Sequence, residues 1–207
     1  YMKYGAEQEK ELMTEIWSPY IKDDPYNFVK FIFPWGQKDT PLEDFEGPRK
    51  WQEEILKKMT VHIQRNQGRV DPEMFRLAVA SGRGIGKSAL VSWLILWMLS
   101  TRLGSTIIVT ANTEQQLRSR TWAELGKWMT LAINSHWWDK TATTIRPAKW
   151  FDEALKRDLK IDTGYYYAQA QLWSEENPDA FAGIHSNYGV CLIMDEASGI
   201  PAPIYSV

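Results

Sequence analysis

A glycine-rich stretch, Ser81-Gly-Arg-Gly-Ile-Gly-Lys-Ser88, carries the residue types that bind nucleotide phosphates. It follows the apolar run 77–80 and opens the longer apolar run 89–99, so we expect a strand, a loop and a helix in that order. In such a loop successive backbone N–H groups turn toward one point, where a phosphate lies at the positive end of the helix. The stretch matches the P-loop pattern, with Ser81 in the place of the usual first glycine. An ordinary glycine turn before a core helix is the alternative interpretation.

The side chains of this stretch predict a bound nucleotide with its metal ion. Lys87 would reach the β- and γ-phosphates, and the Ser88 hydroxyl would hold Mg²⁺. Arg83 lies inside the loop, from which it could reach the γ-phosphate of the same subunit, bridge to a neighbouring subunit or face solvent. We expect ATP to contact Ser81, Gly82, Arg83, Gly84, Ile85, Gly86, Lys87, Ser88 and Ala89.

Two adjacent acids follow a second apolar run. Residues 188–194 are typical of a buried parallel strand, and Asp195 and Glu196 come directly after it. The carboxyl edge of an open α/β sheet is where such folds bind ligands. Asp195 would hold the metal ion, directly or through water. Glu196 would accept the proton of an attacking water, which predicts hydrolysis rather than transfer to another substrate. Two solvated acids in a turn are the alternative.

Composition limits the class of protein. The chain has 207 residues, of which 44% are hydrophobic, enough for one α/β domain with a core. The formal net charge of −2 gives no global basic field, so any DNA contact must come from local patches or from several assembled subunits. The single cysteine, Cys191, excludes an internal disulfide and is expected to be a buried structural thiol. The N-terminal residues are polar and no apolar run reaches the about 20 residues that span a bilayer, so we expect a soluble, cytosolic protein.

Hydrophobic spacing predicts the elements around these motifs. We expect helices over 7–20, 49–64 and 112–133, a buried strand over 105–111, a hairpin of 159–162 with 167–173, and irregular chain over 137–150. Together they predict an α/β fold of the P-loop NTPase class, with a mostly parallel central sheet flanked by helices. We expect an N-terminal helical and irregular segment, 1–47, and an ATPase domain, 48–207, that lacks one or two further βα units after the acidic pair.

The chain contains 11 tryptophans, and we expect them to serve packing rather than stacking on bases. Trp93 and Trp97 are about one helical turn apart and are predicted to lie in the core. Trp137 and Trp138 adjoin each other in an expected loop, so one of the two could be exposed.

In this order the segments resemble the ATPase domain of the large terminase subunit of tailed bacteriophages. The similarity covers roughly residues 40–200 and so most of the chain. The residues that carry it are Arg49-Lys-Trp-Gln-Glu-Glu-Ile-Leu56, Ser81–Ser88, Thr110-Ala-Asn-Thr-Glu-Gln-Gln-Leu-Arg118, Phe181-Ala-Gly-Ile-His185 and Leu192-Ile-Met-Asp-Glu-Ala-Ser198. The glycine loop and the acidic pair occur in many motor ATPases and helicases, whereas their combination with the other segments is more specific.

The resemblance implies a motor that hydrolyses ATP with Mg²⁺ and packs viral DNA in the cytoplasm of a bacterial host. It implies that Gln52 and its neighbour Trp51 contact adenine; from the residues alone, a solvated helical glutamine is the alternative. The implied partners are double-stranded DNA, the portal protein, the small terminase subunit and further copies of the chain in a ring of about five, with no membrane. The family's coupling motif and its RNase H-like nuclease domain would lie beyond Val207, so the full-length protein would also be an endonuclease.

A neighbouring subunit often supplies an arginine finger to motors of this type. The candidates are Arg102, Arg118, Arg120 and Arg146. Arg118 and Arg120 fall near the start of a helix that we expect to be exposed, but the sequence does not decide which of the four arginines is the finger. Two other functions also stay open. One is a DNA helicase or another DNA-dependent ATPase, and the other is a nucleotide-binding switch or scaffold with little turnover, which would not need a catalytic carboxylate at Glu196.

Overall fold

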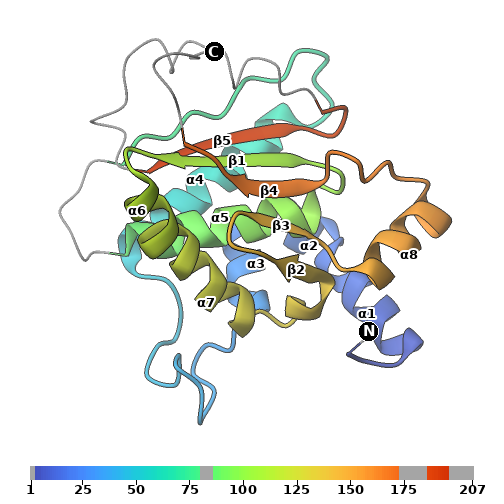
Figure 1. Ribbon diagram of the computed structural model, residues 1–207, viewed down its shortest axis with the longest axis horizontal. Helices are drawn as coiled ribbons and strands as arrows, with labels where there is room; N and C mark the ends of the chain where they lie inside the picture. Colours follow the sequence, from blue (N-terminus) through green and yellow to red (C-terminus); the bar gives the residue numbers. More distant parts are fainter. Residues whose placement is uncertain (1–2, 80–85, 173–185, 196–207) are drawn as a thin grey trace.

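The computed structural model describes residues 3–79, 86–172 and 186–195. Within these ranges one sheet has five strands in the order β2-β3-β4-β1-β5 (Figure 1). The strands are β1 (Thr106–Ala111), β2 (Trp138–Lys140), β3 (Thr144–Pro147), β4 (Tyr167–Ala170) and β5 (Val190–Asp195). The helices are α1 (Ala6–Ile16), α2 (Pro19–Lys22), α3 (Pro25–Ile32), α4 (Lys50–Asn66), α5 (Lys87–Thr101), α6 (Glu114–Gln116), α7 (Ala123–Leu131) and α8 (Lys149–Leu159), with the π-helix η1 (Leu117–Trp122) and the 3₁₀-helix η2 (Ser135–Trp137).

The sheet is mixed, which corrects the expectation of a mostly parallel one. β1 pairs in parallel with β4 and with β5, whereas β3 pairs antiparallel with β2 and with β4. Only residues 141–143 join β2 to β3, and so short a connection allows an antiparallel hairpin but no parallel crossover. The α/β class and the helices flanking the sheet are as expected.

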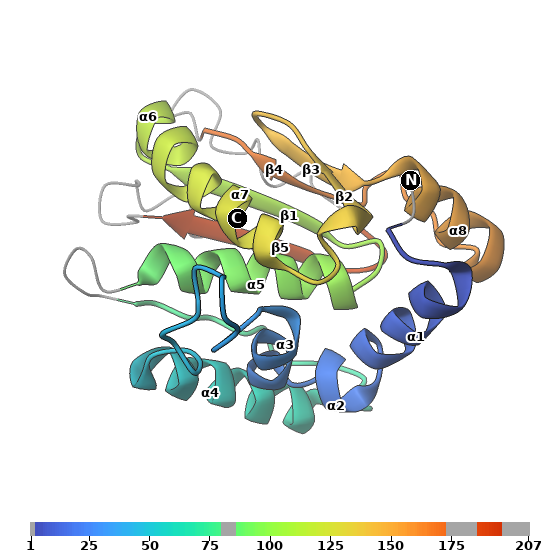
Figure 2. The ribbon, with the colours of Figure 1, turned by 90° about the horizontal axis from the view of Figure 1, so that it is seen from below.

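Helix α5 lies between the sheet and the N-terminal helices α3 and α4 (Figure 2). Its sequence is apolar on every side, and a helix of that kind must be covered on every side. Leu90, Trp93, Ile95, Leu96 and Leu99 are each at most 3% exposed. Trp93 meets the rings of Trp35 and Trp128 at centroid distances of 5.8 and 5.1 Å, so aromatic contacts join α5 to α7 and to the chain after α3.

Several other predictions of local structure are confirmed. The helices expected over 7–20 and 49–64 correspond to α1 with α2 and to α4, and the strand expected over 105–111 corresponds to β1. Trp93 and Trp97 are buried at 2% and 7% exposure. The parallel strand expected over 188–194 corresponds to β5, although its residues are partly exposed or exposed rather than buried. Cys191 in this strand is partly buried, and desolvation raises the pKa of its thiol to about 11, so the thiol stays protonated at neutral pH. In the described ranges, none of the helices has both the length and the apolar character needed to cross a membrane.

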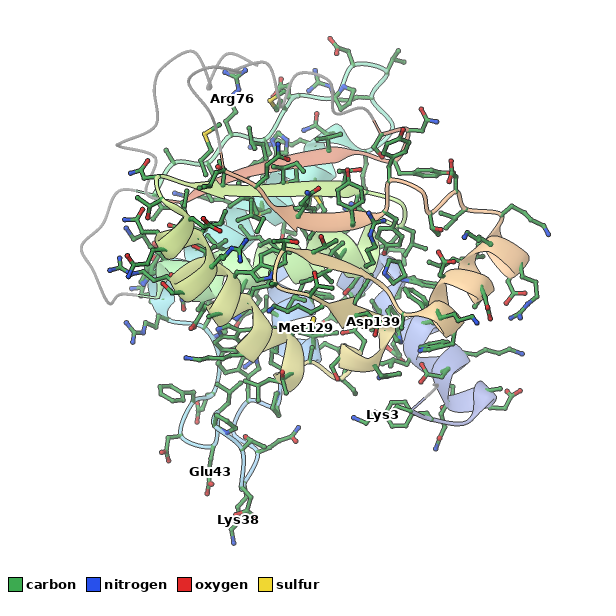
Figure 3. The ribbon with its side chains drawn as sticks, viewed as in Figure 1. Lys3, Lys38, Glu43, Arg76, Met129 and Asp139 are labelled. Atoms are coloured by element: carbon green, nitrogen blue, oxygen red, sulfur yellow. The ribbon has the colours of Figure 1, made fainter. Side chains whose placement is uncertain are left out.

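Four predictions are wrong in the described residues. Residues 77–79 form no strand; they are part of a segment, 72–79, without regular structure, and Arg76 in that segment lies at the outer surface (Figure 3). The hairpin expected between 159–162 and 167–173 does not form, because β3 is the antiparallel partner of β4. The irregular chain expected over 137–150 contains β2, β3 and the start of α8. Trp137 and Trp138 are both buried, at 0% and 4% exposure.

A buried carboxylate fastens α1 to the rest of the molecule. Glu9 is 2% exposed, and its two oxygens meet different partners. Trp137 Nε1 donates to Glu9 Oε2 over 3.2 Å, and His136 Nε2 lies 2.5 Å from Glu9 Oε1. The His136 ring in turn stacks on Trp150 with a centroid distance of 5.8 Å and an interplanar angle of 9°. The partners of Glu9 come from η2, about 130 residues away along the chain, so they hold two distant segments together.

Replacing Glu9 by alanine is expected to lower the free energy of unfolding by about 3 kcal/mol. The change leaves the indole N–H of Trp137 and the imidazole of His136 buried without their acceptor, and each unpaired buried polar group costs about 1–3 kcal/mol. Urea denaturation followed by tryptophan fluorescence measures the loss. Glu11→Ala, at an exposed site of the same helix, is the control and should cost far less. Equal losses in the two variants would contradict the role given to Glu9.

Candidate nucleotide site

Lys87, Ser88 and Asp195, three of the residues expected to bind phosphate and metal, lie at one end of the sheet. α5 and β1 are joined by the short connection 102–105, and the two elements pack against each other. α5 has 15 residues and β1 has 6, so both are about 20 Å long and β1 returns to the level at which α5 began. β5 is parallel to β1, and Asp195 pairs with the last residue of β1, Ala111. The start of α5 and the end of β5 are therefore at the same end of the sheet (Figures 1 and 2).

Gly86, the N-cap residue directly before α5, has a conformation that favours glycine. Its φ is 94° and its ψ is 23°, in the left-handed region. Lys87 and Ser88 are the first two residues of the helix, where backbone N–H groups have no partner within the helix. Both residues are partly exposed. The turn therefore presents an ammonium, a hydroxyl and the first backbone N–H groups of the helix together at a positive helix end, which is the arrangement that suits an anion.

Gln52 braces this turn from α4. Its Nε2 donates to the carbonyl oxygen of Gly86 over 2.9 Å, and its Oε1 accepts from the backbone N–H of Arg49 over 2.8 Å. The side chain is 3% exposed. An amide group has two N–H donors and two acceptor lone pairs, so these bonds use about half of its capacity. Gln52 is thus a buried link between two segments of the site, which corrects the alternative of a solvated helical glutamine.

Trp51 lies beside the same glycine. A Cβ added to Gly86 would lie 2.7 Å from Gln52 Nε2 and 4.0 Å from Trp51 Cζ2. The two residues expected to contact adenine therefore meet the end of the glycine loop. Their contact with adenine itself stays a prediction.

Asp195 ends β5 and is held by a hydroxyl from a distant helix. Thr121 Oγ1 donates to Asp195 Oδ2 over 2.5 Å. Thr121 is 1% exposed and belongs to η1, whereas Asp195 is partly buried. Sequence reasoning did not single out Thr121, because nothing in the spacing of residues 112–133 shows that part of this helix is a π-helix.

The described donors fit Mg²⁺. Asp195 and Ser88 offer a carboxylate and a hydroxyl oxygen at the same end of the sheet, and Mg²⁺ prefers oxygen ligands while keeping several waters and phosphate oxygens in its shell. Carboxylates that bind a metal ion usually also accept a hydrogen bond from a neighbouring side chain, as Asp195 does from Thr121. Five of the predicted phosphate-binding residues, Ser81, Gly82, Arg83, Gly84 and Ile85, and the predicted base Glu196 lie outside the described residues.

The four candidate fingers differ in their surroundings. Arg102 is engaged within its own subunit, since its guanidinium contacts Asp23 Oδ1 at 3.1 Å and lies 4.7 Å from the Trp97 ring. It also lies at the end of α5 opposite to Lys87. The guanidinium carbon of Arg146, on β3, lies 4.7 Å from the centroid of the Tyr167 ring on β4. Arg118 and Arg120 are exposed on η1, as expected, and Arg118 pairs with Glu114 at 2.9 Å.

We expect Gly86→Ala to destabilise the protein by about 1 kcal/mol more than Gly68→Ala. Both glycines have positive φ, 94° and 72°, so alanine at either site meets a strain of about 1–2 kcal/mol. Only at Gly86 does the new Cβ also clash, because Gln52 Nε2 lies 2.7 Å away and nothing lies within 4 Å at Gly68. Overpacking of this kind costs about 1–3 kcal/mol. Chemical denaturation of both variants measures the difference.

A double-mutant cycle identifies Gln52 as the cause. In a Gln52→Ala background the clash is gone, so Gly86→Ala should cost no more than Gly68→Ala does. An unchanged extra cost in that background would mean that Gln52 does not brace the turn.

The sequence was compared with protein-family models and with curated proteins. No family model matches the chain, and the search of curated proteins gave no match either. The interpretation of the site therefore rests on its own residues and on where the fold places them.

Proposed function

We propose that this chain is the Mg²⁺-dependent ATPase motor of a DNA-packaging terminase. The observation that carries the ATPase part is the meeting of two motifs at one end of the sheet. The start of α5 supplies Lys87 and Ser88, and the end of β5 supplies Asp195. The P-loop class is proposed from the sequence motifs, and the terminase assignment and the packaging of DNA from the sequence resemblance.

In the proposed reaction the chain's residues act on a bound ATP. The Lys87 ammonium and the N–H groups at the start of α5 bind the phosphates and neutralise charge as the bond to the γ-phosphate breaks. Ser88 and Asp195 hold Mg²⁺, which when bound neutralises charge on the β- and γ-phosphates. Glu196, directly after Asp195 in the sequence, orients an attacking water and accepts its proton. Arg83 reaches the γ-phosphate from within the loop.

The proposed assembly is a ring around double-stranded DNA. The formal net charge of −2 gives one chain no global basic field for DNA, which favours binding by several subunits together. In such a ring one subunit completes the site of the next with an arginine finger. Arg118 and Arg120 suit that role best, because both are exposed on the segment that also reaches Asp195 through Thr121. The portal protein and the small terminase subunit are the further partners that the resemblance implies, in the cytoplasm of a bacterial host.

Two substitutions are expected to separate binding from chemistry. Lys87→Ala should abolish turnover, because it removes the charge that binds the β- and γ-phosphates. Glu196→Gln should leave ATP binding intact and lower turnover at least about 100-fold, the usual contribution of a positioned base. Phosphate release measures turnover, and calorimetric titration with a non-hydrolysable ATP analogue measures binding.

Matched controls come from α8. Lys149→Ala and Glu153→Gln make the same chemical changes at side chains that are 90% and 60% exposed, and both should behave as the unaltered protein does. Substantial turnover in Glu196→Gln would remove the role given to that carboxylate. ATP binding without turnover in the unaltered protein, with and without double-stranded DNA, would favour a nucleotide-binding switch or scaffold. Strand separation coupled to turnover would favour a helicase over a packaging motor.

A further inference from the structure

We propose that Thr121 is a positioning residue that orients the Asp195 carboxylate for Mg²⁺. This inference rests on the proposed function and adds to it a residue outside the two nucleotide-binding motifs. The contact that carries it joins residues 74 positions apart, with Thr121 Oγ1 donating to Asp195 Oδ2 over 2.5 Å. Thr121 is 1% exposed, so water does not compete for its hydroxyl.

The segment that carries Thr121 is held on both sides. Its neighbour Trp122 is 2% exposed and donates its indole N–H to the carbonyl oxygen of Thr141 over 3.0 Å, which ties η1 to the β2–β3 hairpin. Leu117, at the start of η1, is also 2% exposed and belongs to the hydrophobic core. Directly before η1, the short helix α6 is capped by Thr113, whose Oγ1 accepts a hydrogen bond from Gln116 N over 3.1 Å. The Thr121 hydroxyl is therefore presented from a fixed backbone.

The π-helical turn explains why this threonine reaches the strand end. A π-helix bonds residue i to i+5 and so inserts one extra residue into a helix, which changes the face that later side chains share. Such turns are short, rare and frequent at functional sites. η1 spans Leu117–Trp122 and leads directly into α7, so the insertion lies at the point where the chain passes the end of β5.

The hydrogen bond constrains the carboxylate without using it up. The two oxygens of an ionised carboxyl group offer about four lone-pair positions, and the threonine hydroxyl occupies one of them. The bond limits rotation about the Cβ–Cγ axis of Asp195, so the remaining positions keep a fixed direction. Mg²⁺ requires near-ideal octahedral geometry, which makes its binding sensitive to the direction of each ligand. Loss of such an outer partner typically lowers metal affinity or activity about 10–100-fold.

The test compares variants of two buried threonines, Thr121 on η1 and Thr106 on β1. In Thr121→Val the hydroxyl is replaced by a methyl group of similar size, whereas Thr121→Ser keeps the hydroxyl. Thr106→Val is the matched control, because Thr106 is 0% exposed, bonds the carbonyl oxygen of Tyr165, and lies at the opposite end of β1, paired with Val190. Asp195→Asn serves as the reference for loss of the metal ligand. For each variant, calorimetry gives the Mg²⁺ concentration that half-saturates binding of a non-hydrolysable ATP analogue, and denaturation without Mg²⁺ gives the stability.

The expected result is a half-saturating Mg²⁺ concentration raised about 10-fold in Thr121→Val and close to the unaltered value in Thr121→Ser and Thr106→Val. Thr121→Val and Thr106→Val should lose similar stability without Mg²⁺, because each loses one buried hydroxyl bond. If Thr121→Val does not fold, the same Mg²⁺ titration is made with Thr121→Ala, which also lacks the hydroxyl and should show the same rise in the half-saturating Mg²⁺ concentration.

Two results would overturn the inference. Only the second would also contradict the proposed role of Asp195 as a metal ligand. An unchanged Mg²⁺ requirement in Thr121→Val beside a raised one in Asp195→Asn means that Thr121 is only structural, and the proposed function stands. An unchanged requirement in both variants, or no Mg²⁺-dependent binding in the unaltered protein, removes the metal role of Asp195 and the inference with it.

Discussion

The extensive burial of α5, in which only Ala89, Val91, Leu94 and Met98 among the apolar residues are partly exposed, is the constraint on which the rest of the structure depends. A helix with apolar side chains around its whole circumference gains stability only when each side is covered, because each buried large apolar side chain contributes about 1.5–3 kcal/mol. β1 covers one side, α3 covers another, and α7 packs along a third. This arrangement places the start of α5 at the end of the sheet. The position of the candidate site thus follows from core packing rather than from contacts made by the site residues themselves.

Bracing from outside the two nucleotide-binding motifs completes the site. Gln52 reaches the last glycine of the loop from α4, and Thr121 reaches the carboxylate of Asp195, the proposed metal ligand, from η1. Both side chains are almost fully buried and both bond across long sequence separations. Such buried polar contacts are costly unless satisfied, so they favour one arrangement of the segments over looser alternatives. The same principle applies at the far side of the molecule, where Glu9 joins α1 to η2.

Parts of the fold could be predicted from local patterns because local physics decides them. The amphipathic spacing of 49–64 predicts α4, and the β-branched run 105–111 predicts β1. The strand expected over 77–80 illustrates the limit of that reasoning. Apolar residues there suggested a strand, but a strand exists only through a partner, and residues 77–79 pair with none in the described chain. The hairpin expected over 159–173 failed for the same reason, since β4 takes β1 and β3 as neighbours.

The sequence by itself determined which side chains could do chemistry. Glycine, lysine, serine and paired acids are chemical types whose order along the chain already indicates phosphate and metal binding. The tertiary structure decided that Ser88 and Asp195 lie at the same end of the sheet, and that the buried residues Gln52 and Thr121 contact Gly86 and Asp195 there. Pairing direction and helix packing come from contacts between segments far apart in sequence, such as the 74 residues that separate Thr121 from Asp195. No local pattern encodes a contact of that kind, because its free energy appears only once the intervening chain has folded.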